Sequence, residues 1–385
     1  MSLPAKLGRL LSRTFGRSPR VAVVASQIVP FDGVSNAVRD TIRAVTGAGW
    51  PVSVFTANNQ FGSFPAQIVN SADELMRSRA FRSAEIILYH FAFYHDLFEI
   101  IPTGNGKAVQ IVLFHNVTPE QFMGDELRPL VRASFAQIQH FHRAERLWPF
   151  THTNAKVLID AGLDASRIRV VDPVVPWPRR RLHADKAGLP VDILFVGRIT
   201  KSKGVLDLLD AAERVRASCQ VPFRLSLVGN RTDADYYDTV QKRCAALGPL
   251  VTLAGRCDSD ELQRRYHEAH ILAIPSYHEG FCRPVAEGLR AGCVPVGYAG
   301  YHLPLVANGL GRLVAPGDIT ALAAALTAMI EGVAEASGKP AGQLPLDRGQ
   351  TSVAAFDALA GDHVAQFSFA RFSAAVTGEI RTLTR

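Results

Sequence analysis

The chain has 385 residues, of which 48% are hydrophobic and 20% are charged. This composition is typical of globular proteins and excludes a collagenous, coiled-coil or wholly disordered chain. The length predicts about two to three domains, whose cores are large enough to need no disulfide or structural metal. The net charge of +7 favours polyanionic partners: nucleic acid, an anionic membrane or phosphorylated small molecules.

The N-terminal segment, residues 1–17, is basic and amphipathic. On a helix its leucines would lie on one side and its lysine and arginines on the other, with no acidic residue. Two interpretations stay open: an interfacial helix on anionic lipid at the inner face of the cell membrane, or a frayed basic terminus. No apolar run in the chain approaches the roughly 18–20 residues of a membrane span, and no signal-peptide core follows the basic residues.

The cysteines indicate the compartment. There are five, an odd number, widely spaced and without a CxxC pair. This pattern argues against a disulfide framework and a zinc knuckle, and it predicts a reducing compartment and a cytoplasmic protein. The five are Cys219, Cys244, Cys257, Cys282 and Cys293.

The first half of the chain alternates between strand and helix patterns. A helical spacing of apolar residues covers 35–49. Parallel strands joined by helices predict a doubly wound sheet, which we assign to an N-terminal domain of residues 1–175. The expected strands are 20–26, 51–57, 84–91 and 108–116.

A proline-rich stretch at 171–190, which includes an arginine run, is interpreted as a solvated linker, because helices and central strands do not tolerate so many prolines. Strand and helix patterns then resume and predict a second doubly wound domain within 176–361. Residues 336–350 are interpreted as a flexible loop, and helical spacing returns in 362–385. The expected second-domain strands are 191–197, 223–230, 271–276 and 294–298, and the helices are 203–217, 258–270, 283–292 and 318–333.

The segment HEGFCRPVAEGLRAG, residues 278–292, follows one of these strands. Gly280 permits a close backbone approach, and the N–H groups of 280–283 near a helix start can hold an anion. Carboxylates at Glu279 and Glu287 could accept hydrogen bonds from hydroxyl groups, which would suit a sugar joined to phosphate. The alternative is a solvated Glu279 and an incidental Glu287.

A second segment, VGRITKSKG at 196–204, also follows a strand. Gly197 opens the turn, and the cations Arg198 and Lys203 precede a helix, which suits a diphosphate. The alternative is a pair of ordinary surface cations. In the first half, Gly33 could bring backbone N–H groups near a phosphate, but the absence of GxGxxG weighs against a dehydrogenase.

Histidines at strand ends are further candidates. His115 would face a cleft if its strand is central, although a lone histidine is more often structural. His90 and His95 carry a weaker version of the same argument. His140, His142 and His152, with Glu145 as the nearby acid, form no convincing ligand set, so no metal site is expected.

Taken together, these segments resemble the GT-B-fold retaining glycosyltransferases of family 4. The resemblance rests on 196–204 with the following helix, on LSLVGN, on HEGFCRPVAEGLRAGCVPV and on GRLVAPGDITALAAAL, in the expected order over most of 190–335. LFHNVTPEQF resembles a stretch of bacterial polysaccharide-assembly members. QFSFARFSAAV resembles the last helix of the family, so 362–385 is expected to cross back to the N-terminal domain.

The resemblance implies an α/β GT-B architecture of two Rossmann-like domains facing a central cleft, with the acceptor in the first domain and a nucleotide-sugar donor in the second. Arg198 and Lys203 would hold the diphosphate, Glu279 the sugar hydroxyls, and Glu287 the ribose. His115 would contact the transferred sugar. Implied backbone and nucleoside contacts are Gly33, Gly197, Gly229, Arg256, Gly280, Phe281 and Cys282.

Two departures from the family pattern stand out. Asp32–Gly33 replaces a glycine pair, and EGLRAG places Gly288 inside a helix, at a cost of roughly 1 kcal/mol relative to alanine.

The function implied is retaining, metal-independent transfer of a hexose, with mannose favoured, from a GDP- or UDP-linked donor to a glycan or polyprenyl-diphosphate-linked acceptor. No nucleic-acid partner is expected. The alternatives are an inactive GT-B nucleotide-binding protein in an assembly complex, or a nucleic-acid-binding protein suggested by the charge.

Overall fold

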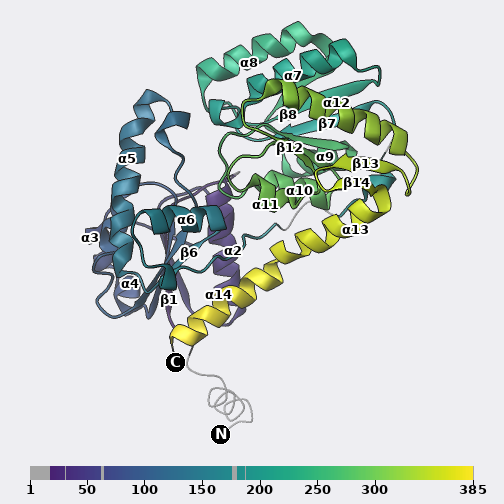
Figure 1. The fold of residues 1–385 in the computed structure, drawn as a ribbon. Helices are drawn as coiled ribbons and strands as arrows, with labels where there is room; N and C mark the ends of the chain where they lie inside the picture. The colour runs from purple at the N-terminus through teal and green to yellow at the C-terminus, as the bar shows by residue number, and fades with distance from the viewer. Residues whose placement is uncertain (1–17, 31, 62–64, 176–179, 187, 385) are drawn as a thin grey trace. The chain divides into compact units, whose positions relative to one another are not determined.

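The computed structural model describes residues 18–30, 32–61, 65–175, 180–186 and 188–384 (Figure 1). The basic segment 1–17 therefore lies outside the described residues. The chain divides into two compact units. The first comprises the chain up to Val117, Pro129–Val174 and Phe369–Arg385, and the second comprises Thr118–Arg128 and Val175–Ser368.

The first unit is built on a parallel sheet in the order β3-β2-β1-β4-β5-β6. The β-branched run expected as the first strand forms β1, which is buried because it lies inside the sheet between β2 and β4. The strands are β1 (Val21–Ile28), β2 (Val52–Asn59), β3 (Gln67–Ile68), β4 (Ile86–Phe91), β5 (Val109–Phe114) and β6 (Arg146–Pro149). The helices are α2 (Gly33–Gly47), α3 (Ala72–Arg77), α4 (Arg79–Ser83), α5 (Arg128–Gln137) and α6 (His152–Asp160), together with α14 (Phe369–Leu383).

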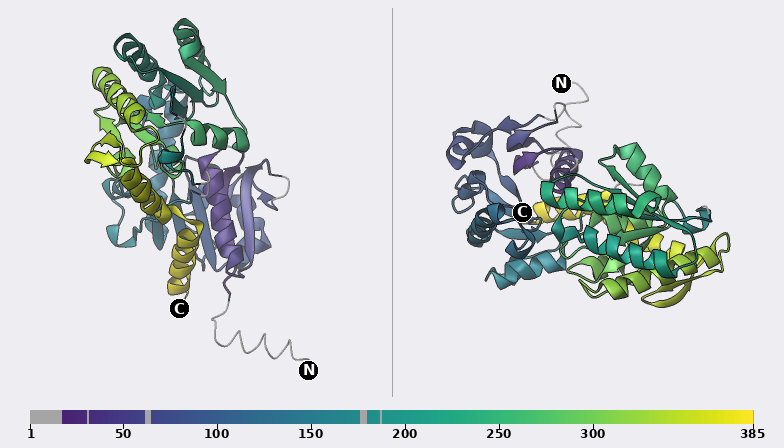
Figure 2. Two further views of the ribbon diagram at one scale, coloured as in Figure 1. Left: turned by 90° about the vertical axis from the view of Figure 1, so that its right-hand side faces the viewer. Right: turned by 90° about the horizontal axis from the view of Figure 1, so that it is seen from above.

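The last helix, α14, packs against α2 within the first unit, and Figure 2 shows the two side by side. Buried Phe372, Val376 and Ile380 recur at helical spacing and join the core of this unit. Next to this stripe on α14, the carboxylate of Glu379 accepts hydrogen bonds from Arg146 and Arg169. The C-terminal part of the chain is thus tied to the first unit by an apolar stripe and a carboxylate.

The second unit repeats the plan with a parallel sheet in the order β12-β11-β10-β7-β8-β9. Helix α7 neighbours both α8 and α12, and helix α10 neighbours both α11 and α13 (Figure 1). The strands are β7 (Val191–Val196), β8 (Phe223–Val228), β9 (Val251–Gly255), β10 (Ile271–Ile274), β11 (Val294–Tyr298) and β12 (Arg312–Val314). The helices are α7 (Val205–Ser218), α8 (Ala234–Leu247), α9 (Ser259–Glu268), α10 (Arg283–Arg290), α11 (Leu303–Ala307), α12 (Ile319–Ala336) and α13 (Val353–Val364).

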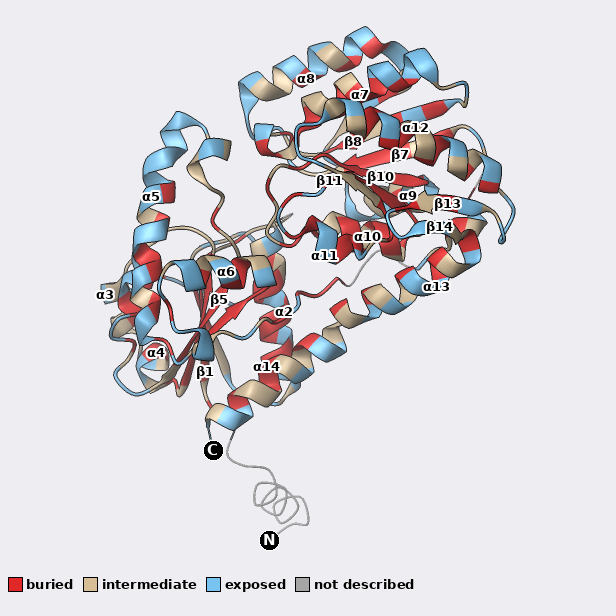
Figure 3. Cartoon of the chain, viewed as in Figure 1, coloured by how far each residue is buried: buried red, intermediate tan, exposed pale blue. Residues whose placement is uncertain are grey.

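Both sheets have the strand order of a doubly wound fold, which confirms the expected pair of Rossmann-like domains. In each, the order reverses direction between two central strands: β1 and β4 in the first unit, β7 and β10 in the second. Ligands of such sheets bind outside the carboxyl ends of the strands at this switch point. Figure 3 shows buried residues concentrated in the strands and on the inward sides of the helices.

Two expectations from the sequence are corrected. Residues 336–350 are not simply a flexible loop: they include β13 (Gln343–Leu346), which pairs antiparallel with β14 (Gly349–Ser352) and buries Leu344 and Leu346. The chain also does contain an apolar helix of membrane-spanning length, α12, by length and composition alone. Half of its apolar stretch is buried, and α12 packs against α7 and strands of the second sheet, as a core helix does.

The proline-rich stretch 171–190 is more firmly anchored than a solvated linker would be. The buried ammonium of Lys186 donates hydrogen bonds to the carbonyl oxygens of Tyr266 (3.1 Å) and Ala269 (2.5 Å). The carboxylate of Asp357 accepts a hydrogen bond from the backbone N–H of His183 at 2.7 Å. Among the described residues of this stretch, these contacts hold 180–186 to the second unit.

Helix α9 begins where its sequence predicts, because Asp258 caps it. The Asp258 carboxylate accepts a hydrogen bond from the backbone N–H of Glu261 at 2.8 Å. We expect Asp258→Ala to lower the free energy of unfolding by about 1 kcal/mol, since it leaves this N–H without its cap. Urea denaturation measures the change. Asp258→Asn is the control and should stay near wild type, because asparagine caps as well as aspartate. An unchanged unfolding midpoint in Asp258→Ala would contradict the assignment.

Candidate functional site

The carboxyl ends of β7, β8 and β9 carry several of the residues predicted from the sequence. Gly197 and Arg198 follow β7, Gly229 follows β8, and Arg256 follows β9. Backbone hydrogen bonds join these ends, from Gly197 N–H to the Val228 oxygen (3.0 Å) and from Gly229 N–H to the Gly255 oxygen (2.9 Å). A Cβ at Gly229 would lie 1.8 Å from the Gly197 oxygen, so only glycine fits there. The arginines are exposed at this edge of the sheet.

Gly204 lets the segment after β7 approach the segment after β10. It has a φ of +62° and is the N-cap residue directly before α7, and a Cβ there would lie 2.1 Å from the Pro275 oxygen. Because glycine alone combines this conformation with this close approach, the turn at Lys201–Lys203 can pack beside the β10 loop. The backbone N–H of Tyr277 accordingly donates to the Ser202 oxygen at 2.9 Å.

Lys203 and Glu279, which were singled out on separate motifs, are in direct contact. The Lys203 ammonium lies 2.7 Å from a Glu279 carboxylate oxygen, and both side chains are largely buried, with 13% and 14% exposed. The same ammonium donates to the His278 carbonyl oxygen (3.2 Å), and the Ser276 hydroxyl donates to Glu279 (2.9 Å). Glu279 is therefore not a solvated surface carboxylate.

The charge state of this cluster follows from its contacts. Burial raises the pKa of the Glu279 carboxyl, but the Lys203 ammonium and hydrogen bonds to the carboxylate outweigh burial and hold that pKa below its ordinary value of 4.5. The stability that the pair provides is therefore present above that ordinary value and is lost as the pH falls through the folded pKa. Burial, and then the charges of Lys203 and Arg198, lower the pKa of His278 to about 4, so its ring is uncharged at neutral pH.

Cys282 is the N-cap residue directly before α10 and has a left-handed conformation, with a φ of +66°. Such a conformation costs a residue other than glycine about 1–3 kcal/mol and is found most often at functional sites. The Cys282 thiol is one of the groups that hydrogen-bond the Glu279 carboxylate. The Phe281 side chain is buried against Phe367, with ring centroids 5.0 Å apart, so only the backbone of Phe281 fits the predicted ligand contact.

Glu287 lies one turn inside α10, as its spacing predicts. Its carboxylate accepts a hydrogen bond from the Tyr266 hydroxyl at 2.9 Å, and the Arg283 guanidinium lies 3.8 Å away. Burial raises the pKa of Glu287 by more than Arg283 and Tyr266 lower it. The next residue, Gly288, is glycine for a packing reason, because a Cβ there would lie 2.7 Å from Leu272 Cδ2 on β10.

In the first unit, His115 follows β5, an interior strand of its sheet. Its Nε2 lies 3.0 Å from Nδ1 of His90, and its ring lies against Phe150 with centroids 4.6 Å apart. Burial lowers the pKa of His115 to about 3. Gly33 is the exposed first residue of α2, and a Cβ there would meet nothing within 4 Å, so the surrounding structure does not itself require glycine.

Sequence reasoning missed an aromatic group beside Glu279. The His278 ring lies 4.2 Å from Tyr301 and 5.7 Å from Phe122, centroid to centroid, and Tyr277 donates to Asp207. Tyr277 and His278 directly precede Glu279, and that adjacency was the available signal. Phe122 and Tyr301 are distant from Glu279 in the sequence, so no sequence signal indicated that they would lie near it.

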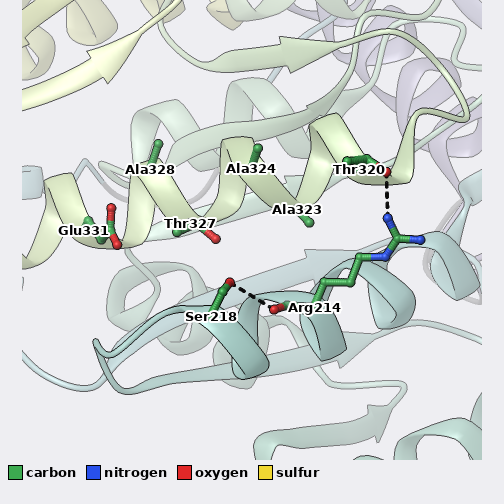
Figure 4. A pocket seen from close by; sticks show the side chains of 8 residues that line it. All are labelled: Arg214, Ser218, Thr320, Ala323, Ala324, Thr327, Ala328 and Glu331. Carbon is green, nitrogen blue, oxygen red and sulfur yellow. Dashed lines mark hydrogen bonds between the residues drawn. The ribbon is translucent and has the colours of Figure 1, made fainter.

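Other surface features do not extend the site. A groove between α7 and α12 is lined mostly by small side chains and contains none of the candidate residues (Figure 4). Within the described part of the chain, no group of three or more His, Cys, Asp or Glu residues is placed to hold a metal ion.

Part of the second unit is similar to a known protein family. Residues 190–332 match the family described as Glycosyl transferases group 1. The D-inositol 3-phosphate glycosyltransferase of Mycolicibacterium smegmatis is 31% identical over 264 residues, which are 64% of this chain and 55% of the relative. The serotype-specific mannosyltransferase WbdA of Escherichia coli is 21% identical over 328 residues, 78% of this chain and 39% of the relative. The chain thus spans 39% and 55% of the length of these two relatives.

Among solved structures, Anabaena HepE in complex with UDP and glucose matches with a TM-score of 0.68 at 16% identity. The match covers 94% of this chain and 100% of that chain. It confirms the expected GT-B fold for nearly the whole chain.

Proposed function

We propose, from the premise that this chain is a GT-B-fold relative of the group 1 glycosyltransferases, that it transfers a hexose from a nucleotide-diphosphate sugar to an acceptor hydroxyl. The observation that carries the proposal is the Lys203–Glu279 pair, which joins the segments that follow β7 and β10; Arg198 also follows β7. Cations suit a diphosphate, and a carboxylate suits the hydroxyls of a sugar. Their position at the switch point of the second sheet is where such folds bind ligands.

The assignment of the remaining residues follows the same logic. Glu287 would accept hydrogen bonds from ribose hydroxyls, and Gly229 and Arg256 would lie beside the nucleoside. Backbone N–H groups of Gly280, Phe281 and Cys282 would contact sugar or phosphate, as would Gly197. His115 would contact the transferred sugar and Gly33 would approach a phosphate; both belong to the first unit, to which we also assign the acceptor.

The proposed transfer retains the anomeric configuration. The bond from the hexose anomeric carbon to the diphosphate oxygen breaks, and a bond from that carbon to the acceptor oxygen forms on the same face. The acceptor proton passes to an oxygen of the leaving diphosphate. Arg198 and Lys203 would stabilise the charge that develops on the diphosphate, so catalysis rests on electrostatics and positioning. With these two cations, the leaving diphosphate would be stabilised without a metal ion.

Mannose is the favoured hexose, because relatives of this chain include the mannosyltransferase WbdA. The nucleotide of the proposed donor carries guanine or uracil; uracil is included because HepE was solved with UDP.

The proposed acceptor is a glycan or a polyprenyl-diphosphate-linked sugar. The enzyme would be cytoplasmic, and the basic segment 1–17 would bring it to the inner membrane face. Deleting 1–17 should then abolish co-sedimentation with anionic vesicles.

A thermal-shift screen against GDP, UDP and their hexose conjugates tests the donor assignment. One nucleotide series should raise the melting temperature by several degrees, since a ligand bound only by the folded state stabilises it. In Glu279→Gln, the rise in melting temperature caused by the nucleotide sugar should shrink more than the rise caused by the free nucleotide. The reason is that the lost carboxylate is assigned to accept hydrogen bonds from the hexose hydroxyls. Glu335→Gln, on the exposed side of α12, is the control. No shift with any of these nucleotides would refute the proposal.

A further inference from the structure

Two histidines meet at the carboxyl end of the first sheet. His90 lies near the end of β4, and His115 follows the neighbouring strand β5. His90 Nδ1 is 3.0 Å from His115 Nε2, and the two ring centroids are 5.2 Å apart. A direct hydrogen bond between neutral imidazoles needs one ring to donate and the other to accept, so this contact constrains where each proton resides.

A histidine at position 90 is less favourable for the stability of the fold than an apolar residue would be. Its side chain is fully buried, and its Nε2 has no hydrogen-bond partner among the described residues. A buried polar atom without a partner lowers the stability of the fold, and an apolar side chain would avoid that loss. Burial, and then the neighbouring His115, lower the pKa of His90 well below its ordinary value, so the ring carries no charge at neutral pH. The hydrogen bond to His115 is the compensating contact.

The proton positions follow from the cost of the unpartnered nitrogen. If His90 accepted at Nδ1, its Nε2 would carry an N–H buried without an acceptor, an arrangement that is rare in folded proteins. If His90 donates from Nδ1–H, its Nε2 holds only an unused lone pair. The second arrangement is the more favourable. It makes His115 Nε2 the acceptor and leaves the proton of His115 on Nδ1.

The backbone of His115 is held independently of its ring. Its N–H donates to the Phe91 oxygen at 2.9 Å, and its carbonyl oxygen accepts from the Asn154 side-chain amide at 2.5 Å. The ring is only partly buried, and its Nδ1 has no hydrogen-bond partner among the described residues. The contact with His90 is therefore what selects the tautomer of a ring whose other nitrogen is open to a ligand.

We propose that His90 is a positioning residue that holds His115 as the Nδ1–H tautomer, so that His115 donates a hydrogen bond to a hydroxyl oxygen of the sugar substrate. The inference rests on the proposed function for the identity of that substrate. The dyad itself is a property of the first unit. Because both rings are uncharged, it presents a polar donor without placing a cation beside the sugar.

A matched pair of variants tests this role. His90→Asn and His90→Leu have the same shape at the δ positions, and both lose the ε atoms of the ring. Only asparagine keeps a donor at the position of Nδ1. His90→Leu should reduce kcat for sugar transfer by about tenfold or more, because the ring that meets the substrate is no longer oriented, while its melting temperature equals or exceeds that of His90→Asn. His90→Asn should stay within about threefold of wild-type kcat, since it still donates to His115. Activity that simply follows stability across the pair would overturn the proposal.

Nitrogen-15 NMR of histidine-labelled full-length protein gives a readout that does not depend on transfer. His115 should show the Nδ1–H tautomer in wild type and in His90→Asn. In His90→Leu it should revert toward the Nε2–H tautomer that free imidazole side chains prefer. An Nε2–H tautomer in wild type overturns the proposal. If no nucleotide sugar binds but the tautomers behave as stated, the proposed function fails and the dyad stands.

Discussion

Replacing Lys203 with alanine is expected to lower the turnover of sugar transfer by about a hundredfold or more. The variant loses a cation assigned to the leaving diphosphate. It also leaves the largely buried Glu279 carboxylate without the ammonium that lies 2.7 Å away. Steady-state transfer assays with the donor identified by thermal shift measure the effect, and kcat should fall more than donor affinity because the charge on the diphosphate grows in the transition state.

Lys201→Ala is the matched control, because Lys201 is an exposed lysine in the same turn. It should retain near-normal transfer. Loss of stability in Lys203→Ala is separated from loss of catalysis by the double variant Lys203→Met/Glu279→Gln. Removing both charges should recover the stability lost through an unpaired buried carboxylate without recovering turnover. Near-normal transfer by Lys203→Ala would exclude the diphosphate role.

Gly204→Ala is expected to have the largest effect on stability, with a loss of about 3 kcal/mol or more in the free energy of unfolding. The added Cβ would lie 2.1 Å from the Pro275 oxygen, a backbone atom that cannot rotate away, and the φ of +62° adds strain. The turn would have to withdraw from the β10 loop, so any folded fraction should also show a weaker response to donor nucleotides. Chemical denaturation and the thermal-shift screen measure the two effects.

Gly47→Ala provides the comparison, since Gly47 ends α2 and a Cβ there meets nothing within 4 Å. That variant should be neutral or slightly stabilising, because alanine loses less conformational entropy than glycine in a helix. A Gly204→Ala protein as stable as Gly47→Ala would show that the close approach of the two loops is not needed.

Much of the fold could be predicted because its signals are local. The buried runs that form β4, β5, β7 and β10 are short and rich in β-branched residues, and α9 begins within one residue of the start of the helix expected at 258–270. The hairpin of β13 and β14 was missed because glycine and proline there resemble loop composition. The pairing of Leu344 and Leu346 against the core is a non-local contact.

The candidate site was predicted in part for the same reason. Strand ends are visible in sequence, so Arg198 and Glu279 could each be placed at a carboxyl edge. Their motifs gave no indication that Lys203 would contact Glu279, because that contact depends on β7 and β10 being neighbours. The helix glycine Gly288 was interpreted only as a weakness, whereas its reason is the side chain of Leu272 on another element.

By itself, the sequence determined the alternation of strands and helices, the repeated doubly wound plan and the residue types that follow each strand, because hydrophobic period and turn chemistry act over a few neighbouring residues. Tertiary structure decided the Lys203–Glu279 pair, the left-handed Cys282, the His90–His115 contact and the anchoring of 180–186. Each depends on strand order, on burial or on the approach of two distant backbones. The packed core sets these long-range contacts, and no short segment of the sequence specifies them.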